Sequence, residues 1–223
     1  MEQYGAMRWP WLVAEAGGGA LGAQSLSAFV GALASDRPTP GGGAAAALAL
    51  AMGRALLAMA AAVTGRRASG PEAAWLAAVV ASEGPAATAS IALAERDAQA
   101  FAAIAGALSL PRADEAERAA RRAALAEAAR DAAAEGEAAA RLCLEALRQA
   151  AALEPRVRPS IQGDVRAGRT LAAAALAITL DNLEVNAALL PDSAATALRT
   201  RVADLRAQAA GLTHAAGGDD ERA

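Results

Sequence analysis

The sequence predicts an all-α protein, a single-domain bundle of long alanine-rich helices. Hydrophobic residues make up 55% of the 223-residue chain and aromatic residues only 3%. Alanine is the best helix former and is depleted from strands, and no stretch shows sustained alternation of apolar and polar residues. A core with few aromatics must be built from Ala, Leu and Val in closely packed helices. We expect the alanine-coated helix faces to pair with a second copy as a homodimer.

Proline, glycine and capping residues predict where each helix begins and ends. The expected helices run over about 25–35, from the glycine turn to Thr64, from Pro71 to Leu108, over 114–153, over 161–190, and onward from Pro191. Gly84-Pro85 should kink or split the third of these. In the last helix, one apolar seam is expected from Leu198, Val202, Leu205, Ala209 and Leu212.

Three parts are expected along the chain. Residues 1–24 are Gly-rich and predict a flexible N-terminal extension, 25–213 form the helical domain, and 214–223 form a polar tail. The start of the chain lacks the uninterrupted apolar run of a signal peptide, so we expect a cytoplasmic protein.

Charge and composition exclude several classes of function. The net charge is −3 and the basic residues are scattered rather than clustered on one face, which argues against a nucleic-acid partner. All 21 basic residues are arginine, so no side chain offers an amine for Schiff-base chemistry. No cluster of His, Cys and Asp has metal-ligand spacing, and we expect no metal and no permanently bound cofactor.

One apolar run has the length of a membrane span. As a helix, Gly42 to Val63 would be about 33 Å long, enough to cross a bilayer. Arg54 lies at its middle, where a charge costs about 2.5–3.5 kcal/mol on insertion scales. We therefore expect a buried core helix and no membrane partner.

The entrance to this helix is the most distinctive motif in the chain. It reads Pro38, Thr39, Pro40, Gly41, Gly42 and Gly43. Proline fixes φ before the turn, glycines let another group approach the main chain, and the first amides of a helix lack partners within it. The motif predicts an anion site. From its shape alone, a glycine turn that lets two helices pack tightly is the favoured alternative.

A carboxylate lies on an apolar helical stripe. Leu93, Asp97, Phe101, Ile104 and Leu108 are spaced by three or four residues, so they share one face. Burial would raise the pKa of Asp97, which suits a general acid or base. From spacing alone, an ion pair with one of the arginines is equally expected.

Asp164 and Asn182 point the same way if their helix is unbroken, because 18 residues make five turns. They would lie about 27 Å apart and cannot touch one reacting atom in the same subunit. They serve different ends of a long ligand, meet at a subunit junction, or one of them is structural. Asn186 extends the polar patch, and Gly168 leaves room for a ligand or a neighbouring backbone.

These pieces together resemble the cyclodeaminase/cyclohydrolase family of folate one-carbon enzymes, which includes the formiminotetrahydrofolate cyclodeaminase domain and bacterial methenyltetrahydrofolate cyclohydrolase. The similar segments run in order from about Leu26 to Leu212. They are Leu26–Ser35, the PTPGGG motif at 38–43, Thr64–Arg67, Asp97–Phe101, Leu110–Arg112, Gly163-Asp164, and Asn182 with Asn186.

The resemblance implies a tetrahydrofolate derivative as substrate and carboxylate acid/base chemistry without a metal. It assigns the acid/base work to Asp97 and Asp164. Binding of the folate is assigned to Thr39, Pro40, Gly41, Gly42, Gly43, Arg66, Arg67, Asn182 and Asn186. Arg66 and Arg67 would hold the glutamate carboxylates, although cations at a helix end are stabilising without any ligand.

Two alternatives stay open on the sequence alone. Ala44 and Gly163 stand where the family commonly has serine, and no lysine is present. A catalytically silent helical dimer that retains the family scaffold, with or without the ability to bind folate, is one alternative. A protein-interaction module is the other.

Overall fold

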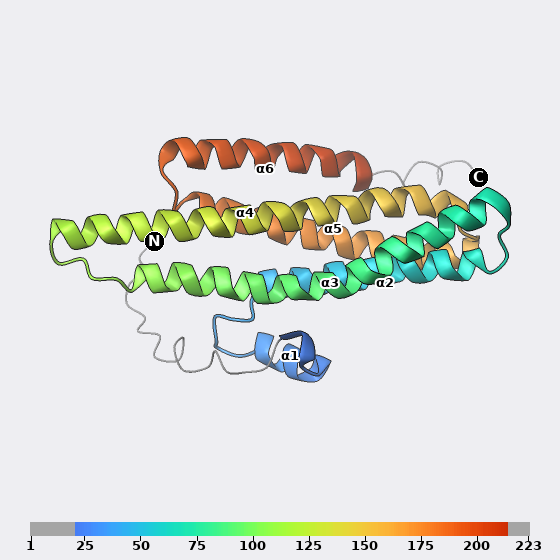
Figure 1. Ribbon diagram of the computed structural model, residues 1–223, viewed down its shortest axis with the longest axis horizontal. Helices are drawn as coiled ribbons and strands as arrows, with labels where there is room; N and C mark the ends of the chain where they lie inside the picture. The colour runs from blue at the N-terminus through green and yellow to red at the C-terminus, as the bar shows by residue number, and fades with distance from the viewer. Residues whose placement is uncertain (1–20, 214–223) are drawn as a thin grey trace, which may run out of the picture.

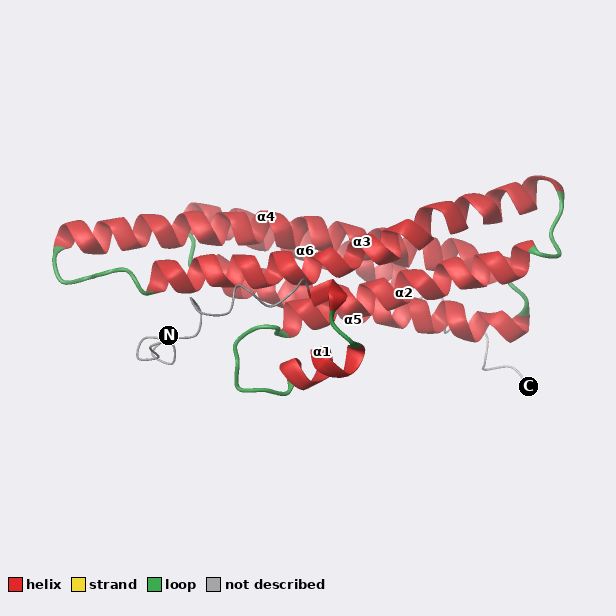
Figure 2. Ribbon diagram, turned by 60° about the horizontal axis from the view of Figure 1, so that its bottom comes forward, coloured by secondary structure: helices red, strands yellow, loops and turns green. Residues whose placement is uncertain are grey.

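The computed structural model describes residues 21–213, and these form an all-helical bundle without strands (Figures 1 and 2). The elements are η1 (Leu21–Ala23), α1 (Leu26–Leu33), α2 (Gly42–Gly65), α3 (Gly70–Leu108), α4 (Glu115–Leu153), η2 (Glu154–Arg156), α5 (Pro159–Ala187) and α6 (Asp192–Thr213). The predicted all-α class is confirmed. Most of the predicted extension and the whole predicted tail, 1–20 and 214–223, lie outside the described residues. Residues 21–23 form a 3-10 turn that contacts α3.

Four long helices make up the bundle. α2 packs against α3 and α5, and α4 packs against α3 and α5 in turn. α6 lies along the side of the bundle formed by α4 and α5, and α1 lies at the opposite side (Figure 1). The seam of α6 is buried at Leu198, Val202 and Leu205, so its partner is within the same chain.

Local signals set the helix ends. The side chain of Ser25 accepts a hydrogen bond from the Ala28 amide at the start of α1, and Asp114 accepts one of 2.8 Å from the Glu117 amide at the start of α4. The third helix is continuous through Pro85 rather than split, and it changes direction in its first half (Figure 1).

The core is built from small side chains between a few leucines. Fully buried residues include Leu50, Leu57, Leu76, Leu144, Leu147, Leu153, Leu183 and Leu198, with alanines between them. α2 and α5 come into backbone contact where Gly53 faces Gly168. A Cβ on Gly53 would lie 2.8 Å from the Gly168 carbonyl oxygen, and one on Gly168 would lie 2.9 Å from that of Gly53. Gly168 therefore makes room for a neighbouring backbone.

A buried ion pair joins three helices. Arg54 of α2 is 3% exposed, and its Nη1 lies 3.1 Å from Glu83 Oε2 on α3. Its Nη2 donates to the Leu142 carbonyl oxygen on α4 at 2.7 Å and lies 3.4 Å from Glu145. Burial raises the pKa of Glu83 by more than the Arg54 charge lowers it. The charge in the middle of the apolar run is thus held inside the bundle.

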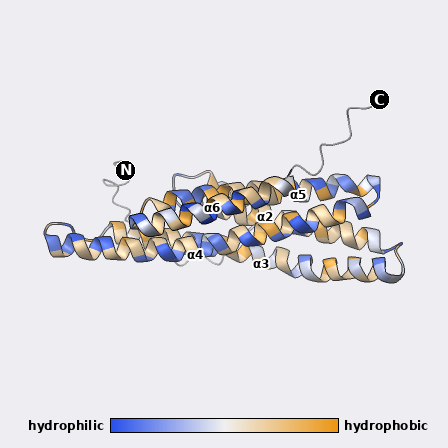
Figure 3. Ribbon diagram, turned by 90° about the horizontal axis from the view of Figure 1, so that it is seen from above, coloured by the Kyte–Doolittle hydropathy of each residue, from blue (hydrophilic) through white to orange (hydrophobic). Residues whose placement is uncertain are grey.

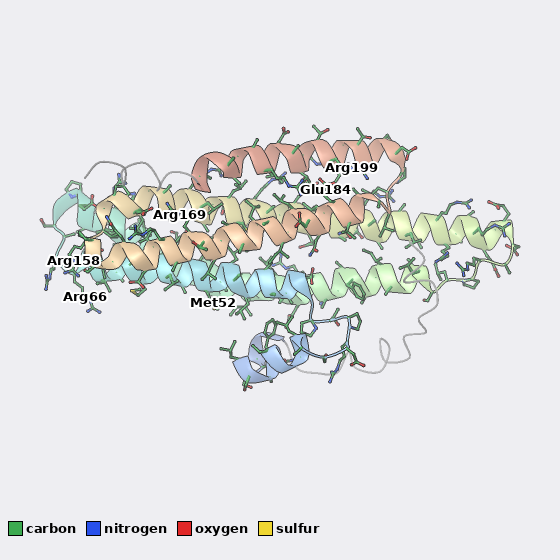
Figure 4. The ribbon with its side chains drawn as sticks, turned by 180° about the vertical axis from the view of Figure 1, so that it is seen from behind. Met52, Arg66, Arg158, Arg169, Glu184 and Arg199 are labelled. Atoms are coloured by element: carbon green, nitrogen blue, oxygen red, sulfur yellow. The ribbon has the colours of Figure 1, made fainter. Side chains whose placement is uncertain are left out.

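Two helices, α2 and α3, are long and apolar enough to cross a membrane by length and composition. In α2, 56% of the most apolar window is buried inside the bundle, as in a core helix; in α3 the share is 33%. Hydrophilic residues are distributed along α4 and α6 (Figure 3). Between α5 and α6, Arg199 lies 3.7 Å from Glu184, and Arg206 lies 3.0 Å from Asp181 (Figure 4).

Candidate active site

A pocket of about 250 Å³ lies where the start of α2 meets the second half of α3, the middle of α4 and the end of α5. Its apolar wall comes mainly from Leu50, Leu93, Phe101, Ile104 and Leu183. Its polar groups are Thr39, Arg96, Asp97, Glu135, Cys143, Thr179, Asn182 and Asn186, and the backbone of Gly41, Gly42 and Gly43 completes the lining. Four widely separated parts of the sequence therefore meet in one cavity.

Asp97 and Gly43 are in direct contact in this pocket. A Cβ placed on Gly43 would overlap the Asp97 carboxyl group, 2.6 Å from Oδ2 and closer still to Oδ1. The carboxyl group therefore rests on the backbone of the first turn of α2, which only a glycine permits. The structure thus brings the acid of α3 against the glycine motif at the start of α2.

The environment of Asp97 changes its acidity. Burial raises the pKa of Asp97, and a hydrogen bond from the backbone amide of Ala44 opposes this by stabilising the charged form. Ala44 lies in the first turn of α2, where amides have no partner within the helix. The net effect is a carboxyl group that holds its proton to higher pH than a free aspartic acid does.

Of the other predicted binding residues, Thr39, Asn182 and Asn186 reach the pocket, whereas Pro40 is absent from its lining. Thr39 lines it, and the Thr39–Pro40 peptide bond is cis. Asn182 and Asn186 line it from α5, one turn apart. Thr179 lines it too, but its hydroxyl donates to the Ala175 carbonyl oxygen of its own helix at 2.8 Å. The asparagines therefore supply the amide groups of the α5 wall.

The remaining predicted site residues lie elsewhere. Arg66 follows the end of α2, 23 residues or about 34 Å along the helix axis from Gly43. Arg66 lies at the same end of the bundle as Arg158 (Figure 4). Arg67 and Asp164 are likewise absent from the pocket lining. Within one chain, the structure does not bring Asp164, Arg66 or Arg67 together with Asp97.

Sequence reasoning overlooked an ion pair in the lining. Arg96 Nη1 on α3 lies 3.5 Å from Glu135 Oε2 on α4, and both side chains are about half exposed, at 51% and 50%. No local sequence signal predicts this ion pair, because Arg96 and Glu135 are 39 residues apart in the chain.

Cys143 is the other lining residue that the sequence did not place in a site. Burial raises the pKa of its thiol to about 12, so the thiol remains protonated at neutral pH. It behaves as a small core residue, buried within α4. Within residues 21–213, no three or more His, Cys, Asp or Glu side chains come together in a way that could hold a metal ion.

The fold and pocket define a class of all-helical protein in which one helix presents an acid to the glycine-rich start of another. The chain matches the formiminotransferase-cyclodeaminase family over residues 25–204, and it belongs to that family. A solved structure of formiminotetrahydrofolate cyclodeaminase from Thermotoga maritima is similar in fold, with a TM-score of 0.73 and 24% identity. The similarity covers 86% of this chain and 93% of that one. No curated protein sequence matches the chain.

Proposed function

We propose that the protein is a folate one-carbon enzyme that acts as a formiminotetrahydrofolate cyclodeaminase, with Asp97 as its acid. The observation that carries this proposal is the half-buried Asp97 carboxyl group resting on the backbone of Gly43 inside a pocket. Membership of the formiminotransferase-cyclodeaminase family supports the substrate class. Methenyltetrahydrofolate cyclohydrolase activity is the second candidate, because water attack on the same one-carbon unit uses the same acid/base group.

In the proposed reaction, N10 of the folate attacks the formimino carbon, and the N10 proton passes to the formimino nitrogen. Asp97 gives that nitrogen a second proton, the carbon–nitrogen bond breaks, and ammonia leaves. The product is a methenyl bridge with a positive charge, and the Asp97 carboxylate left behind faces that charge. A raised pKa suits this task because the group must hold a proton before the reaction.

The neighbouring groups have binding roles in this proposal. The amides at the start of α2, from Gly41 to Gly43, orient carbonyl or anionic groups of the folate ring, and Thr39 lines that edge. Asn182 and Asn186 donate and accept hydrogen bonds from the α5 wall. The ring system lies against the apolar side chains of Phe101 and Ile104.

Asp164 has a place in the proposal only where two copies meet, because it lies about 27 Å along α5 from Asn182. We propose a homodimer on the strength of exposed apolar side chains on α2. Met52 and Met59 are 44% and 37% exposed and lie two turns apart on that helix, and Figure 4 shows Met52 on the outer side of α2. In such a dimer, Asp164 of one copy would serve the pocket of the other. We place the enzyme in the cytoplasm, where folate one-carbon chemistry occurs.

The decisive experiment measures ammonia release from 5-formiminotetrahydrofolate, together with the absorbance of the methenyl product. Purified wild-type protein is expected to release ammonia, and Asp97→Asn is expected to lower the rate about 10²- to 10⁴-fold. Hydrolysis of methenyltetrahydrofolate without ammonia release would assign the cyclohydrolase reaction instead. Folded protein that shows neither reaction would support the alternative of a silent family scaffold.

A subunit-mixing experiment tests the role of Asp164. If Asp164 acts across a dimer interface, Asp97→Asn and Asp164→Asn proteins are each impaired alone. Refolded together, they form some dimers with one intact site, and activity returns. Full activity of Asp164→Asn alone would remove Asp164 from the proposed machinery.

A further inference from the structure

The outer edge of the pocket carries a charged pair that has no role in the proposed chemistry. Arg96 projects from α3 next to Asp97, and Glu135 projects from α4. One contact of 3.5 Å, between Arg96 Nη1 and Glu135 Oε2, links them. Both side chains are half exposed, so the pair lies where the pocket meets solvent.

Arg96 is the one cation among the side chains that line this pocket in the described part of the chain. The two ionisable carboxyl groups of the lining belong to Asp97 and Glu135, and neither offers a positive charge to a carboxylate. Among the described lining residues, an anionic group of a ligand can thus form an ion pair only with Arg96. The arginines expected to bind carboxylates, Arg66 and Arg67, follow the far end of α2, about 34 Å from Gly43.

The size of the cavity determines which part of a folate reaches Arg96. Its volume of about 250 Å³ is below the range of roughly 300–1,000 Å³ typical of small-molecule sites. A folate that places its one-carbon unit at Asp97 therefore has its glutamate tail outside the cavity, and Arg96 is the cation of the lining that lies at the solvent-exposed edge.

A ligand carboxylate can readily take the place of Glu135 in the ion pair with Arg96. Half-exposed ion pairs with a single contact are weak in water, because solvent screens them and two long side chains must be held still. A guanidinium group binds a carboxylate best through two parallel N–H donors. An incoming carboxylate that makes two such contacts can replace Glu135.

We propose that Arg96 is the carboxylate-binding residue of this pocket, that it selects folates with a charged glutamate tail, and that Glu135 holds its guanidinium in place until the ligand binds. This inference rests on the proposed folate function. It adds the residue that distinguishes a charged tail from a neutral one.

The test compares two ligands in the wild-type protein and in Arg96→Gln. One ligand is methenyltetrahydrofolate, and the other is the same molecule with both glutamate carboxylates converted to amides. Wild-type protein is expected to bind the charged ligand about tenfold to a hundredfold more tightly than the diamide, the range for hydrogen bonds to charged groups. Arg96→Gln is expected to lose that preference, through weaker binding of the charged ligand alone.

Three further variants sharpen the result. Arg96→Lys should keep part of the preference, because it retains the charge but not the paired donors. Glu135→Gln should bind the charged ligand as tightly as wild type or more tightly, because the competing carboxylate is gone. Arg201→Gln removes a partly exposed pair with Glu137, between α6 and α4, outside this lining, and should leave both affinities unchanged.

The outcomes separate this inference from the function on which it rests. Wild-type protein that discriminates between the ligands, with Arg96→Gln retaining the full preference, overturns the role of Arg96 and leaves the enzyme assignment intact. Wild-type protein that binds and converts neither ligand overturns the proposed function, and the role of Arg96 with it. Circular dichroism of each variant verifies that the bundle is folded.

Discussion

The carboxyl group of Asp97 occupies the space that a side chain on Gly43 would fill. The two residues are 54 positions apart in the chain, on α3 and α2, and their contact places the acid against the unpaired amides of a helix start. Both parts of this arrangement depend on the absence of a Cβ at position 43.

Gly43→Ala is therefore expected to disable the site without unfolding the bundle. The new methyl group forces the Asp97 carboxyl away from α2, and a displacement of about 1 Å can cost about a hundredfold in rate. Steady-state kinetics of ammonia release measure the effect. Gly106→Ala is the matched control on α3, because a Cβ there meets nothing within 4 Å. Equal activity in Gly43→Ala and wild type would contradict the contact.

Asp97 is expected to make stability depend on pH. Its pKa in the folded protein is raised above its value in the unfolded chain, so the folded state binds the proton more tightly. The contribution is complete below the unfolded pKa of about 3.9 and is lost as pH rises through the folded value. Asp97→Asn should be more stable than wild type at high pH, with a gap that closes at acidic pH. Urea unfolding over a pH series measures it, and a gap that widens toward acid would refute this sign.

Removing the buried cation is expected to destabilise the bundle strongly. Arg54→Met leaves Glu83 buried without its partner, which typically costs about 3–5 kcal/mol. The cost should grow with pH, because Glu83 escapes part of it by taking up a proton. Adding Glu83→Gln should recover much of the loss. Chemical denaturation of both single variants and the double variant tests this, and simple additivity would argue against a coupled pair.

The contact between α2 and α5 should not tolerate added volume. Gly53→Ala places a methyl group 2.8 Å from the Gly168 carbonyl oxygen, and such overpacking typically costs about 1–3 kcal/mol. Gly163→Ala, where a Cβ on α5 meets nothing within 4 Å, is the control and should be neutral or slightly stabilising. Thermal unfolding distinguishes the two. A Gly53→Ala protein as stable as wild type would mean that the helices can separate freely.

The proposed homodimer predicts a change of mass on mutation. The double substitution Met52→Glu and Met59→Glu puts charge on the exposed apolar row of α2 and should convert a particle of twice 22.1 kDa into one of 22.1 kDa. Multi-angle light scattering reads this directly. Ala119→Glu, on the exposed surface of α4, is the control and should retain the wild-type mass. A wild-type protein that is already monomeric rejects the dimer.

The helices could be predicted from the sequence because their signals are local. Ser25, Asp114 and Pro71 each act within one turn of their own helix, and the structure places all three at helix starts. The apolar helix face that carries Asp97 could also be predicted from local spacing. Leu93, Phe101 and Ile104 follow the same spacing, and they line the same pocket.

Contacts between helices could not be predicted in this way. Arg54 donates hydrogen bonds to Glu83 and Glu145, which are 29 and 91 residues away in the chain. Nothing in the sequence distinguishes these two glutamates from the other acidic residues. Arg66 and Arg67 were grouped with the glycine motif by family resemblance, but the length of α2 separates them from it within one chain. Arg96 was overlooked because its relation to Glu135 depends on how α3 lies against α4.

The scarcity of large side chains in the core has a consequence for how this chain can vary. Positions such as Ala60, Ala146, Ala172 and Ala175 are fully enclosed, and alanine already carries the smallest side chain that has a Cβ. Nearly every replacement there adds atoms where no space exists, whereas a leucine core can also lose them. Tolerated sequence drift at these positions should be confined to glycine, serine and alanine, and a saturation mutagenesis profile of α2, α4 and α5 would record that one-sided pattern.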